Sequence, residues 1–377
     1  MLSLLIAGCA STQARPAAVP SSGPTASESV TAPPAPTPSP TPATLSLDDI
    51  FGSPKNLRGV DASRVVTLIV TGDVIPGRNV NVAMVRRNDF LWPFRATVDY
   101  LHSGDIEFIN LESPLVLGCP VRATGMSFCG DPRFINGLAY AGVNVANLAN
   151  NHLTNYGPSG TNSTVKLLAD HGIQPSGLGF VAHISVKGVR FAFLGFNGVG
   201  GAINRAEMQR QVADARSGAD VTVVQFHWGK EYVLYPQSTN DSIAPDDPKQ
   251  VGRLAVDAGA DLVIGNHPHA VQGVEIYKGK LITYAHGNFV FDQMWTPDPG
   301  QEDPRNGVVG RYTFVDGRLF AVSYRPIRIY EYGQPRFVGN AYGDYVIGLM
   351  RLSSEMLAGQ VPAGPPPSPP PGVAPPA

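Results

Sequence analysis

The chain has 377 residues, of which 43% are hydrophobic and 15% are charged, so it can bury the core of one large domain or of two smaller ones. Its formal net charge of -2 leaves no basic surplus, which argues against a nucleic-acid partner. There is also no long acidic run of the kind that forms a solvated tail.

The N-terminus, Met1 to Cys9, combines an apolar run with two small residues and a cysteine. The run is too short to cross a bilayer as a helix, and it resembles the cleavage site of a bacterial lipoprotein. No Lys or Arg precedes it, which departs from that pattern. We expect lipidation at Cys9 and an exported chain anchored to the outer face of the membrane or cell wall. An ordinary apolar N-terminus is the alternative.

Composition divides the rest of the chain. Residues 10–59 are dominated by a stretch rich in Pro, Ala, Ser and Thr, which cannot bury a core and predicts a disordered stalk. Residues 60–358 carry the patterns of a folded domain. Residues 359–377 form a second Pro-rich segment, which we expect to be a disordered tail.

Apolar runs alternate with helical spacing along the folded region. The predicted strands are 64–70, 106–109, 143–148, 191–194, 221–226 and 262–264. The predicted helices are 92–103, 132–141, 161–171, 206–217 and 248–258. This alternation indicates βαβ crossovers and buried sheets, and therefore an α/β fold. After Val274 the pattern changes to hairpins, with turns at Lys278-Gly279 and Asp316-Gly317.

Two cysteines, Cys119 and Cys129, remain if Cys9 is acylated. An exported compartment permits a disulfide between them. It would close a short loop and stabilise the fold by roughly 3 kcal/mol at most. Two free buried thiols are the alternative.

Short polar stretches follow several of the predicted strands. They contain the residues Asp73, Glu112, Asn151, His152, His227, His267 and His269. Strands hold geometry while the loops at their ends carry chemistry, so this pattern is how an α/β protein builds a metal site. The pair His267 and His269 is the strongest signal, because the rigid Pro268 between them limits alternatives and imidazole is a common ligand of divalent transition metals.

The remaining residues of this set have structural alternatives. Asp73 would otherwise cap a turn or pair with Arg78, and Glu112 would cap the loop near Pro114. A lone His227 at the end of a strand is as often a packing residue as a ligand. The pair that follows it in the chain favours the metal interpretation.

Six motifs occur in order between Gly72 and Asp292: GDVIPGR, FINLESPL, NLANNHLTNYG, FHWGKEY, DLVIGNHPHAVQG and YAHGNFVFD. Together they resemble the CapA family of bacterial capsule and poly-γ-glutamate synthesis proteins, over essentially the whole folded region. That family is similar to the calcineurin-like metallophosphoesterases. The resemblance therefore implies a metallophosphoesterase-like, four-layer αββα sandwich.

The resemblance also implies roles for the polar residues. Asp73 and His269 would bind a first metal ion, with Glu112 in the bridging position. A second ion would be bound by Asn151, His227 and His267. His152 would donate a proton to a leaving group. The residues expected to orient ligands or contact substrate are Asn110, Arg78, Glu231 and Asn288.

The expected cofactor is one or two divalent ions of manganese, iron or zinc, which suit mixed imidazole, carboxylate and amide ligands. Three positions depart from the related patterns. Ile75 stands where such phosphoesterases have a His ligand, and Glu112 stands where they have Asp. The dipeptide Ala285-His286 replaces Ser-Leu in the last motif. His286 is either an extra polar residue in the wall of the site or, as we favour, a surface substitution.

Two functions from different classes fit this sequence. The first is a metal-dependent hydrolase that acts on a phosphoester or on the amide bonds of a wall polymer. The second is a non-catalytic accessory protein that binds a poly-glutamate or poly-glutamine chain during its synthesis, export or wall attachment. The expected partners are membrane-bound synthase or export subunits, an anionic or amide polymer, and the membrane through a lipid anchor. A substrate-binding lipoprotein of a transporter is a weaker third interpretation.

Overall fold

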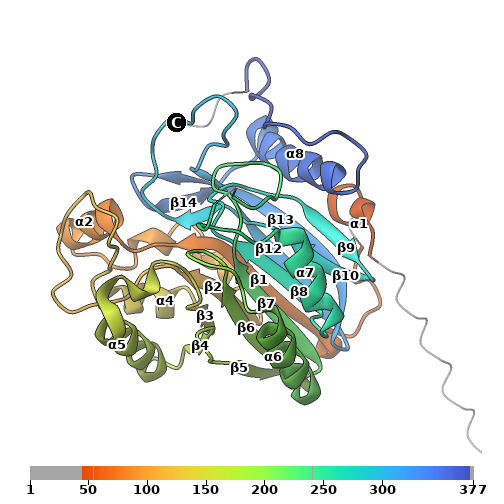
Figure 1. The fold of residues 1–377 in the computed structure, drawn as a ribbon, viewed down its shortest axis with the longest axis horizontal. Coiled ribbons are helices and arrows are strands. Elements are labelled where there is room, and N and C mark those ends of the chain that lie inside the picture. Colours follow the sequence, from red (N-terminus) through yellow and green to blue (C-terminus); the bar gives the residue numbers. More distant parts are fainter. Residues whose placement is uncertain (1–44, 54, 240, 374–377) are drawn as a thin grey trace, which may run out of the picture. The chain divides into compact units, whose positions relative to one another are not determined.

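Two β-sheets lie face to face in a computed structural model that describes residues 45–53, 55–239 and 241–373 (Figure 1). The predicted lipidation site, Cys9, lies outside the described residues. One sheet has eight strands and the other has six. The protein is thus a mixed α/β protein, as the alternation of apolar runs and helical spacing predicts.

The larger sheet has the order β14-β13-β12-β1-β2-β3-β4, and β11 pairs with the end of β1. Its strands are β1 (Val65–Val74), β2 (Ile106–Leu111), β3 (Val145–Asn147), β4 (Gln174–Ser176), β11 (Asn288–Val290), β12 (Asn306–Val315), β13 (Arg318–Tyr330) and β14 (Gln334–Phe337). Strands β1 to β4 are parallel, whereas β12 to β14 are antiparallel.

The smaller sheet has the order β5-β6-β7-β8-β10-β9. Its strands are β5 (Ala182–Val186), β6 (Val189–Asn197), β7 (Val221–His227), β8 (Leu262–Asn266), β9 (Val274–Tyr277) and β10 (Lys280–Thr283). The four central strands are parallel, and β5 and β9 pair antiparallel at the two edges. Parallel strands leave the sheet at one edge, so the loops after them gather there.

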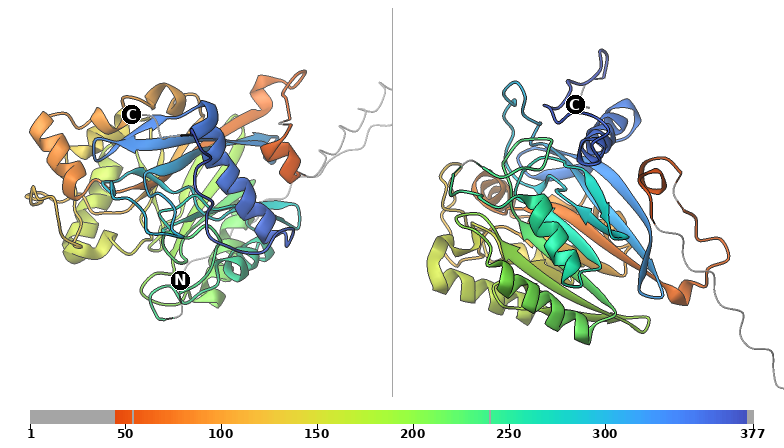
Figure 2. Two further views of the ribbon diagram at one scale, coloured as in Figure 1. Left: turned by 90° about the horizontal axis from the view of Figure 1, so that it is seen from above. Right: turned by 45° about the vertical axis from the view of Figure 1, so that its right-hand side comes forward.

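Helices join these strands and cover the sheets. The helices are α1 (Leu47–Phe51), α2 (Arg78–Arg87), α3 (Val98–Leu101), α4 (Phe134–Tyr140), α5 (Gly157–Asp170), α6 (Arg205–Gly218), α7 (Pro248–Asp257) and α8 (Asn340–Leu357), with short 3-10 segments η1 (Ala62–Arg64), η2 (Trp92–Phe94) and η3 (Leu153–Tyr156). Figure 2 shows α6 and α7, in green and teal, apart from α8 in dark blue. In the described part of the chain, no helix is both long and apolar enough to cross a membrane.

Three apolar cores separate four layers. The middle core lies between the sheets, where Phe108 of β2 meets Phe193 of β6 with ring centroids 5.0 Å apart. A second core joins the larger sheet to α2, α4 and α5, for example through Met84, Leu138 and Leu168. A third joins the smaller sheet to α6 and α7. The four-layer αββα sandwich that the resemblance implies is therefore confirmed.

Several local features differ from the sequence predictions. The helix predicted over 92–103 is broken into η2 and α3, and three helices, α1, α2 and α8, were not predicted. Helix α1 lies within the range assigned to the stalk, and Leu45 and Ile50 are buried, so the packed region begins before residue 60. In the segment predicted as a tail, the carbonyl of Pro367 accepts a hydrogen bond from Tyr345 Oη at 3.0 Å.

Close packing at Gly265 provides a test of this fold. A Cβ at Gly265, in β8, would overlap the carbonyl oxygen of Tyr284 and lie 2.5 Å from Trp228 Nε1. These two groups also share a 3.0 Å hydrogen bond. We predict that Gly265→Ala lowers the free energy of unfolding by about 1–3 kcal/mol through overpacking, measured by urea denaturation.

The matched control is Gly348→Ala in α8, where an added Cβ meets no atom within 4 Å. We expect this variant to be stabilised by about 0.5–1 kcal/mol, because alanine loses less backbone entropy than glycine in a helix. Equal unfolding midpoints for the two variants would contradict the packing described for β8.

Candidate metal centre

The strand register brings polar side chains from distant parts of the chain to one edge of the sandwich. Asp73, near the end of β1, is the register partner of Asn110 in β2 and of Asn288 in β11. In the other sheet, His227 of β7 is the partner of Asn266 in β8. The predicted gathering of strand-end residues is thus a direct result of parallel pairing in both sheets.

Three groups of side chains in the described residues offer ligand atoms within 4.8 Å of one another. The groups are Asp73, Glu112 and His269; Glu112, His227 and His267; and Glu231, His267 and His269. Glu112 belongs to the first two groups, so its carboxylate lies between them. That position is the one the resemblance implies for a bridging acid.

The Asp73 carboxylate is fully buried and richly hydrogen-bonded. Its Oδ1 accepts from Asn110 Nδ2 at 2.8 Å and from Asn266 Nδ2 at 2.7 Å. The backbone N–H of His267 donates to Oδ2 at 3.3 Å. Burial opposes ionisation, but the hydrogen bond and positive charge of His269 hold the pKa of Asp73 below its usual value. Asp73 is therefore a charged carboxylate at neutral pH.

One ring nitrogen of His269 lies within hydrogen-bonding distance of two side-chain oxygen atoms. Its Nδ1 lies 2.8 Å from Asn288 Oδ1 and 3.2 Å from Asp73 Oδ2. Burial disfavours the charged ring, but Asp73 and Glu112 outweigh it and raise the pKa of His269 to about 9. A cation bound here would therefore compete with a proton for His269.

Glu112 lacks the partners that a buried carboxylate needs. It is fully buried, and its Oε1 accepts no hydrogen bond, although His227 Nε2 lies 3.4 Å away. Burial, together with the charge of Asp73, raises the pKa of Glu112 well above its usual value. A buried oxygen without a partner is destabilising, and a divalent cation between the ligand groups would satisfy it. The residues present therefore fit a metal ion.

The histidines of the second group are neutral rings. Burial lowers the pKa of His227 to about 3 and that of His267 well below its usual value. His227 Nε2 lies 2.9 Å from Asn151 Oδ1, and Nδ1 of His267 has no hydrogen-bond partner. Neutral imidazoles are the form that ligates metal, so these residues need no deprotonation to bind one.

His152 lies beside the ligand groups without belonging to any of them. Its ring stacks on Phe128 with centroids 4.0 Å apart, and burial lowers its pKa to about 4. Its Nδ1 is 2.9 Å from Asn155 Oδ1, which also accepts from the backbone N–H of Phe128. Because that second bond fixes the oxygen of Asn155, Nδ1 of His152 is the donor and Nε2 carries the lone pair. A neutral His152 must accept a proton before it can donate one.

Arg78 forms one wall of a neighbouring cavity of about 310 Å³, together with residues that include Met126 and Trp295. Its guanidinium pairs with Asp292 and lies 4.6 Å from the ring centroid of Phe128. The charge predicted to contact an anionic substrate is thus already balanced by a carboxylate. The disulfide between Cys119 and Cys129 closes the loop whose residues 123–126 also line this cavity.

Two of the departures noted in the sequence have a structural explanation. Ile75 is fully buried in the core between the larger sheet and its helices, so position 75 offers nothing to a metal. His286 is also fully buried, and its Nε2 lies 2.8 Å from Tyr312 Oη. The favoured interpretation of His286 as a surface substitution was wrong, because its side chain is fully buried against Tyr312.

Sequence reasoning missed Asn266 and Tyr232. Asn266 immediately precedes His267 and holds the carboxylate of Asp73, and an amide beside a ligand pair is a signal that could have indicated this role. Tyr232 lies 6.0 Å from His269 between ring centroids, and its hydroxyl accepts from Gln293 Nε2 at 2.6 Å. No local pattern points to Tyr232, because its position depends on the path of the loop after β7.

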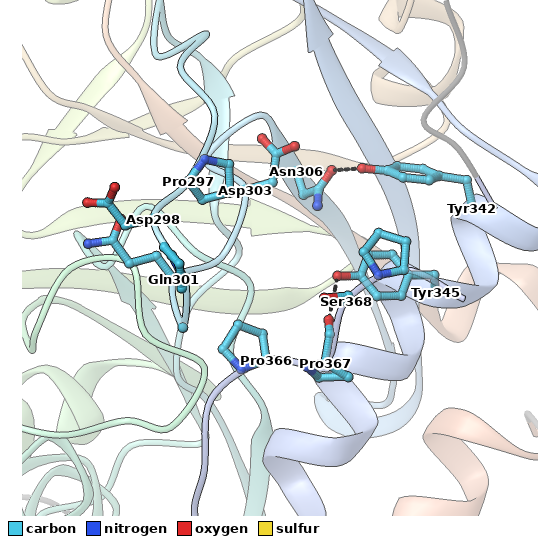
Figure 3. A pocket seen from close by; sticks show the side chains of 13 residues that line it. Pro297, Asp298, Gln301, Asp303, Asn306, Tyr342, Tyr345, Pro366, Pro367 and Ser368 are labelled. Atoms are coloured by element: carbon cyan, nitrogen blue, oxygen red, sulfur yellow. Dashed lines mark hydrogen bonds between the residues drawn. The ribbon is translucent and has the colours of Figure 1, made fainter. Parts of the chain in front are cut away.

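Figure 3 shows a second cavity, of about 360 Å³. It is lined by the 297–306 segment, by Tyr342 and Tyr345 of α8, and by residues 366–369. Two of the lining residues are joined by a hydrogen bond, which Tyr342 Oη donates to Asn306 Oδ1 at 2.7 Å. The cavity contains none of the candidate metal ligands.

Comparison with known proteins supports the family resemblance that the ordered motifs indicate. The model of the family described as bacterial capsule synthesis protein PGA_cap matches residues 67–293. The capsule biosynthesis protein CapA of Bacillus anthracis is 31% identical over 304 residues, which cover 73% of this chain and 70% of that protein. A protein of Mycobacterium tuberculosis (strain H37Rv), described as a "probable polyglutamine synthesis accessory protein", is 28% identical over 297 residues, or 69% of this chain and 76% of that protein.

Among solved structures, a hypothetical protein from Thermus thermophilus matches 72% of this chain and 100% of its own, with 16% identity and a TM-score of 0.45. The family match spans all the candidate ligands, from Asp73 to His269. With the long alignment to CapA, it shows that the chain belongs to the PGA_cap family of bacterial capsule synthesis proteins.

Proposed function

We propose that the protein acts in the assembly of a poly-glutamate or poly-glutamine capsule or cell-wall polymer, as a metal-dependent hydrolase of that polymer or of a phosphoester linked to it. The process is supported by the names of its relatives, which concern capsule biosynthesis and polyglutamine synthesis. The observation that carries the chemistry is Glu112, a buried carboxylate with an unpartnered oxygen between two groups of metal-ligand side chains.

The chain offers carboxylate, amide and imidazole ligands together, which suits manganese, iron or zinc. The residues that would hold one or two such ions are Asp73, Glu112, Asn151, His227, His267 and His269. When bound, a divalent ion supplies Lewis acidity that polarises a substrate oxygen. His152, neutral and bonded to Asn155, would take up a proton of the attacking water at Nε2 and pass it to the leaving group as the bond to that group breaks.

A specific observation favours a second function, that of a non-catalytic accessory protein. Ile75 packs in the apolar core, where the phosphoesterase pattern calls for a ligand, so one ligand of a full dinuclear site is missing from its usual position. One relative also carries the word accessory in its description. In this role the site would bind or guide the polymer beside membrane-bound synthase or export subunits, without cutting it.

We extend the proposal to location at the outer face of the membrane. The support is the apolar run that ends at Cys9. Cys9→Ala should remove the acylation site and shift the protein from the membrane fraction to the soluble exported fraction, as measured by cell fractionation and mass spectrometry of the N-terminus. Unchanged membrane association and an unmodified Cys9 in the parent chain would contradict the anchor.

Metal content tests the site directly. We predict that the purified full chain retains divalent metal and that Asp73→Ala/His269→Ala loses most of it, because two charged or imidazole ligands are removed at once. Elemental analysis by mass spectrometry is the measurement. The matched control is Asp298→Ala/His183→Ala, which removes an exposed Asp and an exposed His outside the ligand groups. Equal metal content in both double variants would contradict the proposed site.

His152→Ala tests catalysis. We predict that this variant keeps its metal and loses about 10²–10⁴-fold in turnover of phosphoester substrates or glutamyl oligomers, the usual contribution of a positioned acid or base. His183→Ala should leave turnover unchanged, because its exposed side chain belongs to none of the ligand groups.

The same variant separates the two functions in cells. If His152→Ala restores polymer formation to a deletion strain as well as the parent chain does, the accessory function is favoured over catalysis. Failure to restore it, with metal content and protein level intact, favours the hydrolase.

A further inference from the structure

Glu231 lies at the solvent side of the ligand groups and is within reach of two of the histidines. Its Oε1 is 3.8 Å from His267 Nε2, and it offers a ligand atom within 4.8 Å of both His267 and His269. Its side chain is 43% exposed, whereas that of His267 is 2% exposed. The carboxylate therefore covers two buried imidazoles from outside.

The backbone fixes this position. Tyr232, the next residue, donates its N–H to the carbonyl of Pro268 at 2.7 Å, in the middle of the His-Pro-His turn. The carbonyl of Tyr232 accepts from the N–H of Glu302 at 3.0 Å. On the other side, Lys230 donates its N–H to the carbonyl of Gln237 at 2.9 Å. Glu231 thus lies on a loop that is tied to the turn carrying the histidines, and its approach is built into the fold.

Within the described residues, two buried atoms of the ligand groups lack hydrogen-bond partners. Nδ1 of His267 neither accepts nor donates a hydrogen bond, and Oε1 of Glu112, which shares a ligand group with His267, accepts none. Neither atom depends on Glu231, and buried polar atoms without partners indicate that a ligand is missing from these groups. Position 75, which would supply a further ligand in the related phosphoesterases, is occupied by a buried isoleucine.

We propose that Glu231 is a direct carboxylate ligand of a divalent cation held with His267 and His269, and that it supplies from the smaller sheet the ligand that position 75 does not supply from the larger one. This inference rests on the metal site of the proposed function. It changes the role expected for Glu231 from an orienting residue to a ligand, and it gives the site a ligand that is open to solvent.

The test is metal binding, which needs no knowledge of the substrate. Metal-stripped full chain is titrated with Mn²⁺ and, separately, with Zn²⁺ by isothermal calorimetry, for the parent chain, Glu231→Gln and Glu207→Gln. The control removes a carboxylate from α6 whose side chain is 42% exposed and which lies outside every ligand group. Both substitutions remove one negative charge, so a difference between them reports the position and not the charge alone.

We expect Glu231→Gln to lose one metal-binding event or to bind that ion at least about tenfold more weakly. Tenfold is the lower end of the loss in metal affinity even when the mutated residue only hydrogen-bonds to a metal ligand. Glu207→Gln should bind like the parent chain. Mn²⁺ paramagnetic resonance spectra should also change for Glu231→Gln, since a carboxylate leaves the ion.

The outcomes separate the two levels of the proposal. Binding by Glu231→Gln with the stoichiometry and affinity of Glu207→Gln overturns the role of Glu231 and leaves the metal site standing. Absence of binding by the parent chain overturns both. Far-ultraviolet circular dichroism of each variant shows that it is folded, and Glu231→Asp, which keeps a shorter carboxylate, should bind between the parent chain and Glu231→Gln.

Discussion

The buried carboxylate of Asp73 is the constraint on which the rest of the site depends. It belongs to β1 of the larger sheet, yet it accepts hydrogen bonds from Asn266 of the smaller sheet and from the backbone of His267. The amide of Asn110 holds it from the neighbouring strand. One carboxylate thus joins the carboxyl ends of both sheets and orients the turn that carries two histidines. Charge-assisted hydrogen bonds of this kind are stronger than neutral ones, which suits a joint between layers.

His269 balances the charge of Asp73, whereas Glu112 has no cationic partner of its own among the described residues. Two fully buried carboxylates, Asp73 and Glu112, share the site with His269, the one histidine of the ligand groups whose pKa is raised. Burying charged groups costs several kcal/mol each unless they are paired and hydrogen-bonded. A divalent cation would favour the ionised form of Glu112, and perturbed groups of this kind concentrate at functional sites. The electrostatics and the unpartnered atoms therefore favour the same conclusion, a cation site.

The sequence predicts the parts of this design that are local. Strands such as β1 and β7 are continuous apolar runs because both of their faces are buried, and the polar residues after them lie together because the strands are parallel. Helix α2 was missed because its polar sequence shows no clear apolar stripe. The break of the run 92–103 between Phe94 and Val98 has no local sequence signal, because Pro93 lies at the start of η2, where proline is tolerated. The approach of Glu231 to His267 could not be predicted either, since it depends on loop hydrogen bonds between residues far apart in the sequence.

The two sheets contribute different ligand chemistry, and this has a thermodynamic consequence. The larger sheet provides oxygen ligands, from Asp73, Glu112 and the loop with Asn151, while the smaller sheet provides the imidazoles and Glu231. Neither set is complete alone, so the site exists only when the middle core is packed. A cation that binds this folded arrangement and not the unfolded chain stabilises the packing of one sheet on the other by mass action. The apolar Ile75 is consistent with this division of ligands between the sheets. Its side chain packs in the core of the larger sheet, while the proposed ligand Glu231 comes from the smaller sheet.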